Sequence, residues 1–148
     1  MLLALTFLLN SLLVAATMLM HYEVLSFLDR WLPHLAQVSS RLRVLVGVGI
    51  IFISHVAEIW LFGLGYFATL QIDGMGAILG ETQSPFMDCI YLSFVTYTTV
   101  GFGDIVVNGY IRYLTGVEAL TGLILVTWSA SFLFLEMQKY WSGHGKRR

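Results

Sequence analysis

Three long apolar stretches dominate the pattern of hydrophobic and polar positions along this chain. They cover residues 2–20, 44–70 and 111–137. At 1.5 Å per helical residue, each stretch is long enough to cross a hydrocarbon core about 30 Å thick. The first stretch is interrupted only by Thr6, Asn10, Ser11 and Thr17. The pattern therefore predicts three membrane-spanning helices. A cleaved signal peptide is the alternative for the first stretch, but no basic residue precedes it and no clear cleavage site follows it.

Between the first two stretches, residues 21–43 mix apolar and charged positions at helical spacing. Such mixing is typical of an amphipathic helix lying at the membrane interface. Pro33 would bend or restart that helix. The apolar positions are Val24, Leu25, Leu28, Trp31, Leu32, Leu35, Val38 and Leu42. We expect a connector of this kind to join the first span to the second.

A shorter helix is predicted between the second and third spans. Residues 71–84 are polar and rich in glycine, which indicates a loop. Ser84 followed by Pro85 is a typical helix start, and Asp88 in the first turn favours the positive end of the helix dipole. We expect a helix over residues 85–98, which is too short to cross the bilayer.

Composition agrees with a membrane protein and narrows its class. Hydrophobic residues make up 57% of the chain and charged residues 11%, and the mean hydropathy is +0.78. The formal net charge of −1 gives no reason to expect a nucleic-acid partner. Cys89 is the sole cysteine, which excludes an intrachain disulfide. No nucleophile and base pair or metal-ligand cluster stands out beyond the membrane carboxylates, so we expect neither an enzyme nor an organic cofactor.

Basic residues predict the orientation in the membrane. Arg41 and Arg43 precede the second span and Lys139 follows the third, so the positive-inside rule places these ends in the cytoplasm. The first span must then start outside. We expect a multi-pass protein of the plasma (cell inner) membrane, with the N-terminus outside and a basic cytoplasmic tail over residues 139–148. No arginine repeat marks the first span as a voltage sensor.

One short motif lies between the 85–98 helix and the third span: residues 98–104 read TTVGFGD. A dehydrated K⁺ ion needs a ring of oxygens, and backbone carbonyls that face a common axis supply one. An ordinary strand points successive carbonyls to alternate sides, so a one-sided row needs backbone conformations that glycine enters cheaply. Gly101 and Gly103 alternate with Val100 and Phe102 in the required way. The last two side chains would pack outward and hold the loop open.

The motif resembles the selectivity filter of the potassium-channel family, written TTVGYGD or TTVGFGD, and the likeness extends upstream through Tyr91, Ser93 and Thr96. The resemblance implies a homotetramer that conducts K⁺ across the lipid bilayer. It also implies that Thr99, Val100, Gly101 and Phe102 hold K⁺, that Gly103 completes the filter, and that Asp104 lies at the outer mouth, with less certain help from Asp73 and Glu81.

The resemblance covers residues 44–137 and sets the expected architecture. The chain looks like an all-α membrane protein with the tetrameric potassium-channel pore-domain fold, as in a small prokaryotic-type channel, plus one additional N-terminal transmembrane helix and an interfacial amphipathic linker helix. The expected domains are 1–43, a pore domain over 44–138, and the tail. Within the pore domain we expect an outer helix at 44–70, a pore helix at 85–98, a filter at 99–103 and an inner helix at 111–137.

The sequence departs from the family on both sides of the filter. Ile105 to Asn108 stand where relatives often have proline shortly after the Gly-Asp pair. Relatives also support the filter aspartate with a carboxylate or aromatic pair from the pore helix, where this chain has Val95 and Tyr91 with Leu92. The resemblance therefore implies no such support for Asp104.

Gly122 occupies the place where relatives carry a hinge glycine in the inner helix, although a packing role is an equal alternative. If Gly122 faces away from the pore, as in relatives, the opposite face of the helix lines the cavity. The candidates for that wall are Thr127, Ala130, Ser131 and Phe134.

Three ionisable residues lie within the predicted spans: His55, Glu58 and Glu118. Such residues are costly in a bilayer and usually face protein. Glu58 falls on a stripe with Gly47, Ser54 and Gly65, and helical wheels turn Glu118 toward it. We expect one polar cluster, acting either as a static clasp between helices or as a proton sensor for gating.

The function that the sequence favours is potassium-selective passive conduction. A weakly selective cation channel and a non-conducting accessory subunit that retains the pore fold are the alternatives.

Overall fold

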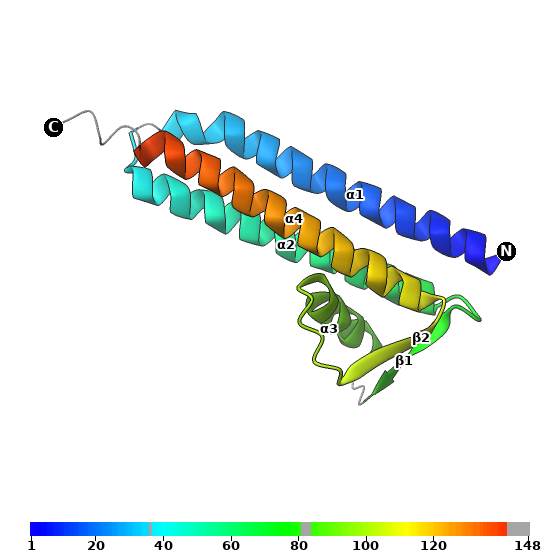
Figure 1. Ribbon diagram of the computed structural model, residues 1–148. Coiled ribbons are helices and arrows are strands. Elements are labelled where there is room, and N and C mark those ends of the chain that lie inside the picture. The colour runs from blue at the N-terminus through cyan, green and yellow to red at the C-terminus, as the bar shows by residue number, and fades with distance from the viewer. Residues whose placement is uncertain (36, 81–83, 142–148) are drawn as a thin grey trace.

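The computed structural model describes residues 1–35, 37–80 and 84–141, with side chains up to residue 139. Three long helices lie side by side along most of its length (Figure 1). They are α1 (Leu2–Trp31), α2 (Ser40–Leu70) and α4 (Ile111–Trp141). Each is long and apolar enough to cross a membrane, over residues 2–35, 40–70 and 111–139. The prediction of three spans is confirmed.

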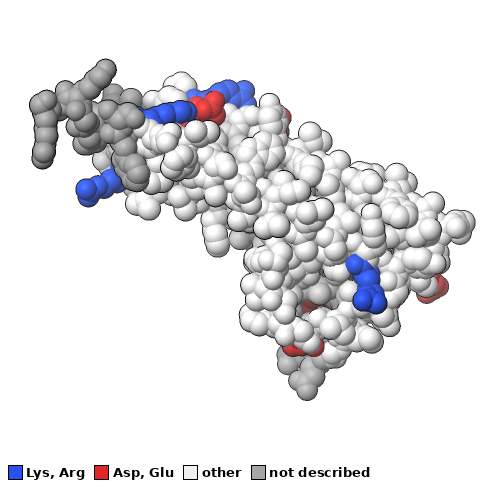
Figure 2. Space-filling model, in the orientation of Figure 1, with Lys and Arg blue, Asp and Glu red and all other residues white. Residues whose placement is uncertain are grey.

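Charged side chains agree with this arrangement. On the face shown in Figure 2, Lys, Arg, Asp and Glu gather toward the two ends and leave a broad uncharged band between them. At one end Lys139 on α4 pairs with Asp29 on α1 at 3.4 Å and with Glu136 on its own helix. At the other end the hydroxyl of Thr6 on α1 contacts the Met75 sulfur at 3.5 Å. The N-terminus and the end of α4 therefore lie at opposite ends of the bundle (Figure 1).

The expected interfacial linker helix is wrong. Residues 21–31 continue α1 without a break, and Pro33 lies in a short 3-10 helix, η1 (Leu32–Leu35). The apolar positions that suggested an amphipathic surface helix pack inside the bundle instead: Leu25, Leu28 and Leu32 are buried in one cluster with Ile51 of α2. Because burial against α2 satisfies this apolar face, the helix extends through the bundle until proline geometry ends it. The outer helix also begins earlier than expected, at Ser40.

The short helix α3 (Pro85–Tyr97) lies where a helix over residues 85–98 was expected, and it ends one residue earlier. Pro85 occupies its first turn, and the carboxylate of Asp88 accepts a hydrogen bond from the Ser84 backbone N–H at 3.1 Å. That contact satisfies one of the N–H groups that a helix start leaves unpaired. Hydrophobic packing then holds α3 against α2 and α4 in a cluster containing Phe62, Tyr66, Leu92, Tyr97 and Leu114.

A two-stranded antiparallel sheet lies beside α3 and was not predicted. Strand β1 (Gly76–Gly80) pairs with β2 (Ile105–Gly109), with Ile78 opposite Val107. β1 falls in the segment expected to be only a loop, and β2 is the stretch that replaces the proline of relatives. The sheet joins the chain before α3 to the chain after residue 104. It therefore closes the loop that carries α3 and the TTVGFGD motif (Figure 1).

Candidate functional site

The backbone of residues 99–103 has alternating conformations. The φ angle is +58° at Thr99, +51° at Gly101 and +81° at Gly103, whereas φ is not positive at Val100 or Phe102. In an ordinary strand, similar φ values at every residue turn successive carbonyls to opposite sides. Alternating the sign of φ is the kind of change that a one-sided row of carbonyls requires. Glycine accounts for two of the three positions with positive φ. The third is Thr99, and among the described residues it is the one non-glycine residue with positive φ.

Hydrogen bonds donated to α3 carbonyls fix this segment at the carboxyl end of the helix. The Gly101 backbone N–H donates to the Val95 carbonyl at 3.1 Å, and the Thr99 N–H donates to the Thr96 carbonyl at 2.9 Å. The negative end of the α3 dipole therefore lies beside the start of the segment, where it favours a cation. The site therefore combines backbone carbonyl oxygens with the negative end of a helix dipole, and both favour a cation.

The side chains of the segment are exposed in the single chain. Val100 is 56% exposed and Phe102 is 72% exposed, so neither packs within its own chain as a support for the loop. A Cβ built on Gly101 or Gly103 meets no atom within 4 Å. Open space therefore borders the segment, and any packing of Val100 and Phe102 must come from outside this chain.

Asp104, which follows the segment, is supported from α3 after all. The phenol of Tyr91 donates a hydrogen bond to Asp104 Oδ2 at 2.7 Å. This bond holds the pKa of Asp104 below its ordinary value of 3.8 and raises that of Tyr91 above 10.0. The resemblance assigned Tyr91 no such role, because the support in relatives comes from a pair of residues and not from one.

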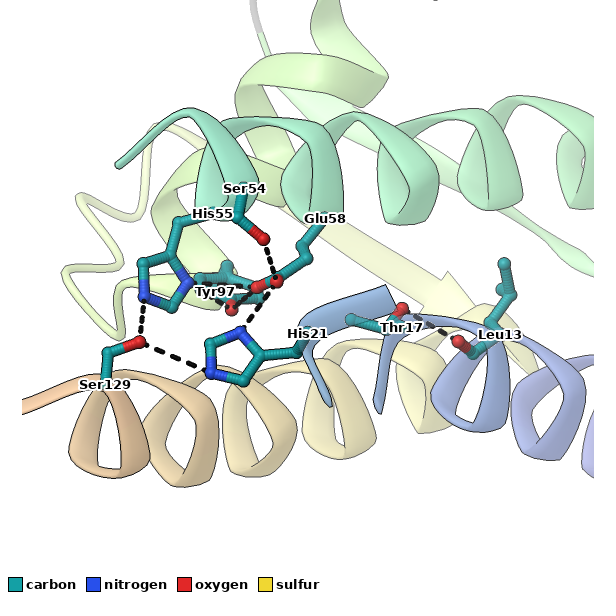
Figure 3. Close-up of polar contacts among 8 residues, drawn as sticks. All are labelled: Leu13, Thr17, His21, Ser54, His55, Glu58, Tyr97 and Ser129. Carbon is teal, nitrogen blue, oxygen red and sulfur yellow. Dashed lines mark hydrogen bonds and ion pairs between the residues drawn. The ribbon is translucent and has the colours of Figure 1, made fainter. Parts of the chain in front are cut away.

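Glu58 lies at the centre of a buried polar group that joins all four helices (Figure 3). We call it the Glu58 cluster; its members are His21, Ser54, His55, Glu58, Tyr97 and Ser129. Glu58 Oε1 lies 2.8 Å from His21 Nδ1 and accepts a hydrogen bond from Ser54 at 2.9 Å. Its Oε2 lies 2.9 Å from His55 Nδ1 and accepts a bond from the Tyr97 hydroxyl. Sequence reasoning missed His21, because it was assigned to a helix outside the bundle.

The second intramembrane carboxylate lies in a separate place. Glu118 on α4 is fully buried and accepts hydrogen bonds from the Tyr66 hydroxyl at 2.5 Å and from Ser93 of α3. It faces the outer helix as expected, but its partner there is Tyr66, not Glu58. Counting 1.5 Å per residue inward, Glu58 lies about 18 Å from the end of α2 and Glu118 about 10 to 12 Å from the start of α4. This offset exceeds one helical turn and splits the expected cluster in two.

Gly122 is in tight contact with the end of α3. A Cβ at this position would lie 2.2 Å from the Tyr97 carbonyl oxygen, closer than real Cβ contacts allow. Bare glycine therefore lets α4 approach the backbone of α3, as a packing role requires. The candidates for the cavity wall are exposed on α4 in the single chain: Thr127, Ala130, Ser131 and Phe134.

Among the other residues proposed for the outer mouth, Asp73 lies in the turn between α2 and β1. Glu81 lies outside the described residues, as do Lys146, Arg147 and Arg148 of the basic tail.

Comparison with known proteins supplies the family. The model of an ion channel family matches residues 44–139, which include α2, α3, the motif and nearly all of α4. No curated protein and no solved structure matched the chain. The family is one of transport proteins and points away from an enzymatic role. With nearly two thirds of its length matched and three helices able to span a membrane, the chain is a multi-pass membrane protein that belongs to the two-transmembrane type of ion channel family.

Proposed function

We propose that this protein is a potassium-selective channel and that residues 99–103 are its selectivity filter. The alternation of positive φ at Thr99, Gly101 and Gly103 within the sequence TTVGFGD is the observation that carries the proposal. Backbone carbonyls of Thr99, Val100, Gly101 and Phe102, together with the Thr99 hydroxyl, replace the hydration shell of K⁺. Gly103 ends the row, and Asp104 raises the cation concentration at the outer mouth.

A single row of oxygens covers only one side of an ion, so the proposal requires several chains around one axis. Four copies related by fourfold symmetry give each ion a complete ring. The exposure of Phe102, the open space beside Gly101 and the exposed apolar face of α4 support this assembly, because each leaves a surface for a neighbouring chain to cover. In the tetramer, Thr127, Ala130, Ser131 and Phe134 line the cavity below the filter.

The orientation follows from charge. Arg30, Arg41, Arg43 and Lys139 lie at the end of the bundle opposite the two-stranded sheet, and Arg112 lies at the same end as the sheet. The positive-inside rule places the first group in the cytoplasm. The N-terminus, Asp104 and the two-stranded sheet then face outward, and the cell inner membrane is the expected location.

A flux assay on the full chain in liposomes tests the proposal. We expect uptake of Rb⁺, a K⁺ substitute, and little uptake of Na⁺, with a tetramer as the reconstituted species by mass. Comparable uptake of both ions would indicate a weakly selective cation channel. No flux from a folded tetramer would indicate a non-conducting subunit, and both results would overturn the proposal.

A further inference from the structure

We propose that His21, His55 and Glu58 form a binding site for a transition-metal ion of the Zn²⁺ class, placed where α1 meets the pore domain. One ligand atom from each residue lies within 4.8 Å of the other two. His21 comes from α1, whereas His55 and Glu58 lie three residues apart on α2. The site therefore forms only when the first span docks on the second.

The donor atoms already converge. In both imidazoles it is Nδ1 that faces the carboxylate, at 2.8 Å from Oε1 for His21 and 2.9 Å from Oε2 for His55. Two histidine nitrogens and a carboxylate oxygen are ligands that Zn²⁺ accepts, at about 2.0 to 2.2 Å from the ion. Ligands on one tetrahedral ion are about 3.3 to 3.5 Å apart by that geometry. Each histidine nitrogen needs to move roughly half an ångström away from the carboxylate oxygen that it faces to admit the ion, with one position left for water.

The side chains that hydrogen-bond to the three ligand residues also fit a metal site. Histidines that bind a metal usually donate their second N–H to an oxygen, which fixes the ring. Ser129 Oγ lies 3.1 Å from His55 Nε2 and 3.3 Å from His21 Nε2, so one hydroxyl oxygen faces both rings (Figure 3). With metal on each Nδ1, both Nε2 atoms carry hydrogen, and the two lone pairs of Ser129 accept them. Ser54 and Tyr97 hold the carboxylate from its other sides.

Without an ion, the hydrogen bonds of both rings depend on which ring nitrogens carry hydrogen. Ser129 has a single proton for two facing Nε2 atoms, and the Tyr97 hydroxyl lies 2.9 Å from His55 Nδ1. Glu58 is fully buried and His21 is 1% exposed, and a buried carboxylate needs a compensating charge. A bound metal ion provides that charge, and the half-buried His55 side chain, 16% exposed, is where the site reaches the surface of the single chain.

The position of the site means that a bound metal ion would hold helices together. Its ligands join α1 to α2, its outer partners come from α3 and α4, and Tyr97 stands two residues before Thr99. An occupied site would clamp the additional N-terminal helix onto the pore domain, next to the base of the proposed filter. Metal binding should therefore stabilise the folded protein by mass action.

The test is Zn²⁺ binding to the purified, chelator-treated full chain, measured by calorimetry and by thermal unfolding. We expect a single saturable Zn²⁺ per chain and a higher melting temperature with Zn²⁺. Mg²⁺ should produce neither effect, because it prefers all-oxygen octahedral sites. Ser129→Ala should weaken binding about 10- to 100-fold, as loss of an outer partner typically does.

The decisive variant is His21→Gln, which keeps an N–H donor for Glu58 but removes the imidazole. Its binding and its Zn²⁺-dependent melting shift should be lost, while its melting temperature without metal confirms that it folds. His34→Ala is the matched control, since His34 lies in η1 and contacts the Arg30 carbonyl. If His21→Gln binds Zn²⁺ as wild type does, or if wild type shows no saturable binding, the proposal is overturned and the cluster is a hydrogen-bond network without a metal site. Neither readout depends on ion flux, so failure here leaves the proposed conduction untouched.

Discussion

The Tyr91 phenol donates a hydrogen bond to the Asp104 carboxylate at 2.7 Å, and so joins the middle of the pore helix to the residue that follows the proposed filter. The two residues are thirteen positions apart, with the whole filter between them. Together with the bond from Gly101 N–H to the Val95 carbonyl, it holds the filter loop to α3 at two points. Loss of the bond between Tyr91 and Asp104 should loosen the proposed filter without unfolding the protein.

Tyr91→Phe tests this directly. The substitution keeps the ring and removes only the hydroxyl, so we expect current through reconstituted channels to decay faster during a maintained voltage, with selectivity in the first moments unchanged. Tyr22→Phe is the matched control, because Tyr22 is exposed on α1. An identical time course in Tyr91→Phe and wild type would show that the bond does not support the filter.

The same bond predicts a response to acid. The pKa of Asp104 is lowered, chiefly by Tyr91, so the contribution of the bond is present above the ordinary aspartate value of 3.8 and is lost as pH falls through the lower folded-state pKa. Tyr91 keeps its proton past pH 10.0, since its pKa is raised. Current decay should therefore be constant at external pH from about 5 to 9 and accelerate only below about 4. Acceleration already near pH 6 would assign the effect to another group.

Gly101→Ala should abolish the preference for K⁺ over Na⁺ through backbone strain. A Cβ at this position has open space in the single chain, but φ is +51°, where a non-glycine residue costs about 1 to 2 kcal/mol. The cost is repeated in each copy of the proposed tetramer. Gly116→Ala is the control, because Gly116 lies in α4 with no atom within 4 Å of the added methyl group. Relative Rb⁺ and Na⁺ uptake measures the result, and unchanged selectivity in Gly101→Ala would contradict the filter assignment.

Gly122→Ala separates the packing and hinge interpretations of this glycine. The added methyl group would overlap the Tyr97 carbonyl oxygen, a backbone atom that cannot move without shifting α3. Overpacking of this kind costs about 1 to 3 kcal/mol, so we expect a clearly lower melting temperature. Gly116→Ala should be neutral or stabilising, as alanine favours an exposed helix. A normal melting temperature with a changed open probability would favour the hinge.

The local sequence was enough to predict the spans, the short helix α3 and the special backbone conformations of the TTVGFGD motif. Apolar runs long enough for a bilayer, the Ser84-Pro85 helix start and the TTVGFGD motif each carry their information within a few neighbouring residues. The conformations at Gly101 and Gly103 follow from the same kind of signal, because few residues other than glycine adopt positive φ cheaply.

What the sequence did not predict depends on contacts between distant segments. His21 stood outside every motif, and only the unbroken course of α1 brings it to Glu58, 37 residues away. The sequence predicts an interfacial helix over residues 21–43, since charge and apolar spacing alone do not show which face another helix covers. Counting residues along α2 and α4 places Glu58 and Glu118 near enough in depth to permit contact. The structure gives the two carboxylates separate partners instead, because closer hydroxyl and imidazole groups from other helices reach each of them first.

The most direct test of the central claim is the reversal potential of the reconstituted full chain, with K⁺ on one side of the bilayer and Na⁺ on the other. The account predicts a reversal potential close to the equilibrium potential of K⁺ and a loss of that preference in Gly101→Ala. A wild-type reversal potential near zero under the same gradient would show that K⁺ and Na⁺ pass equally and would contradict it.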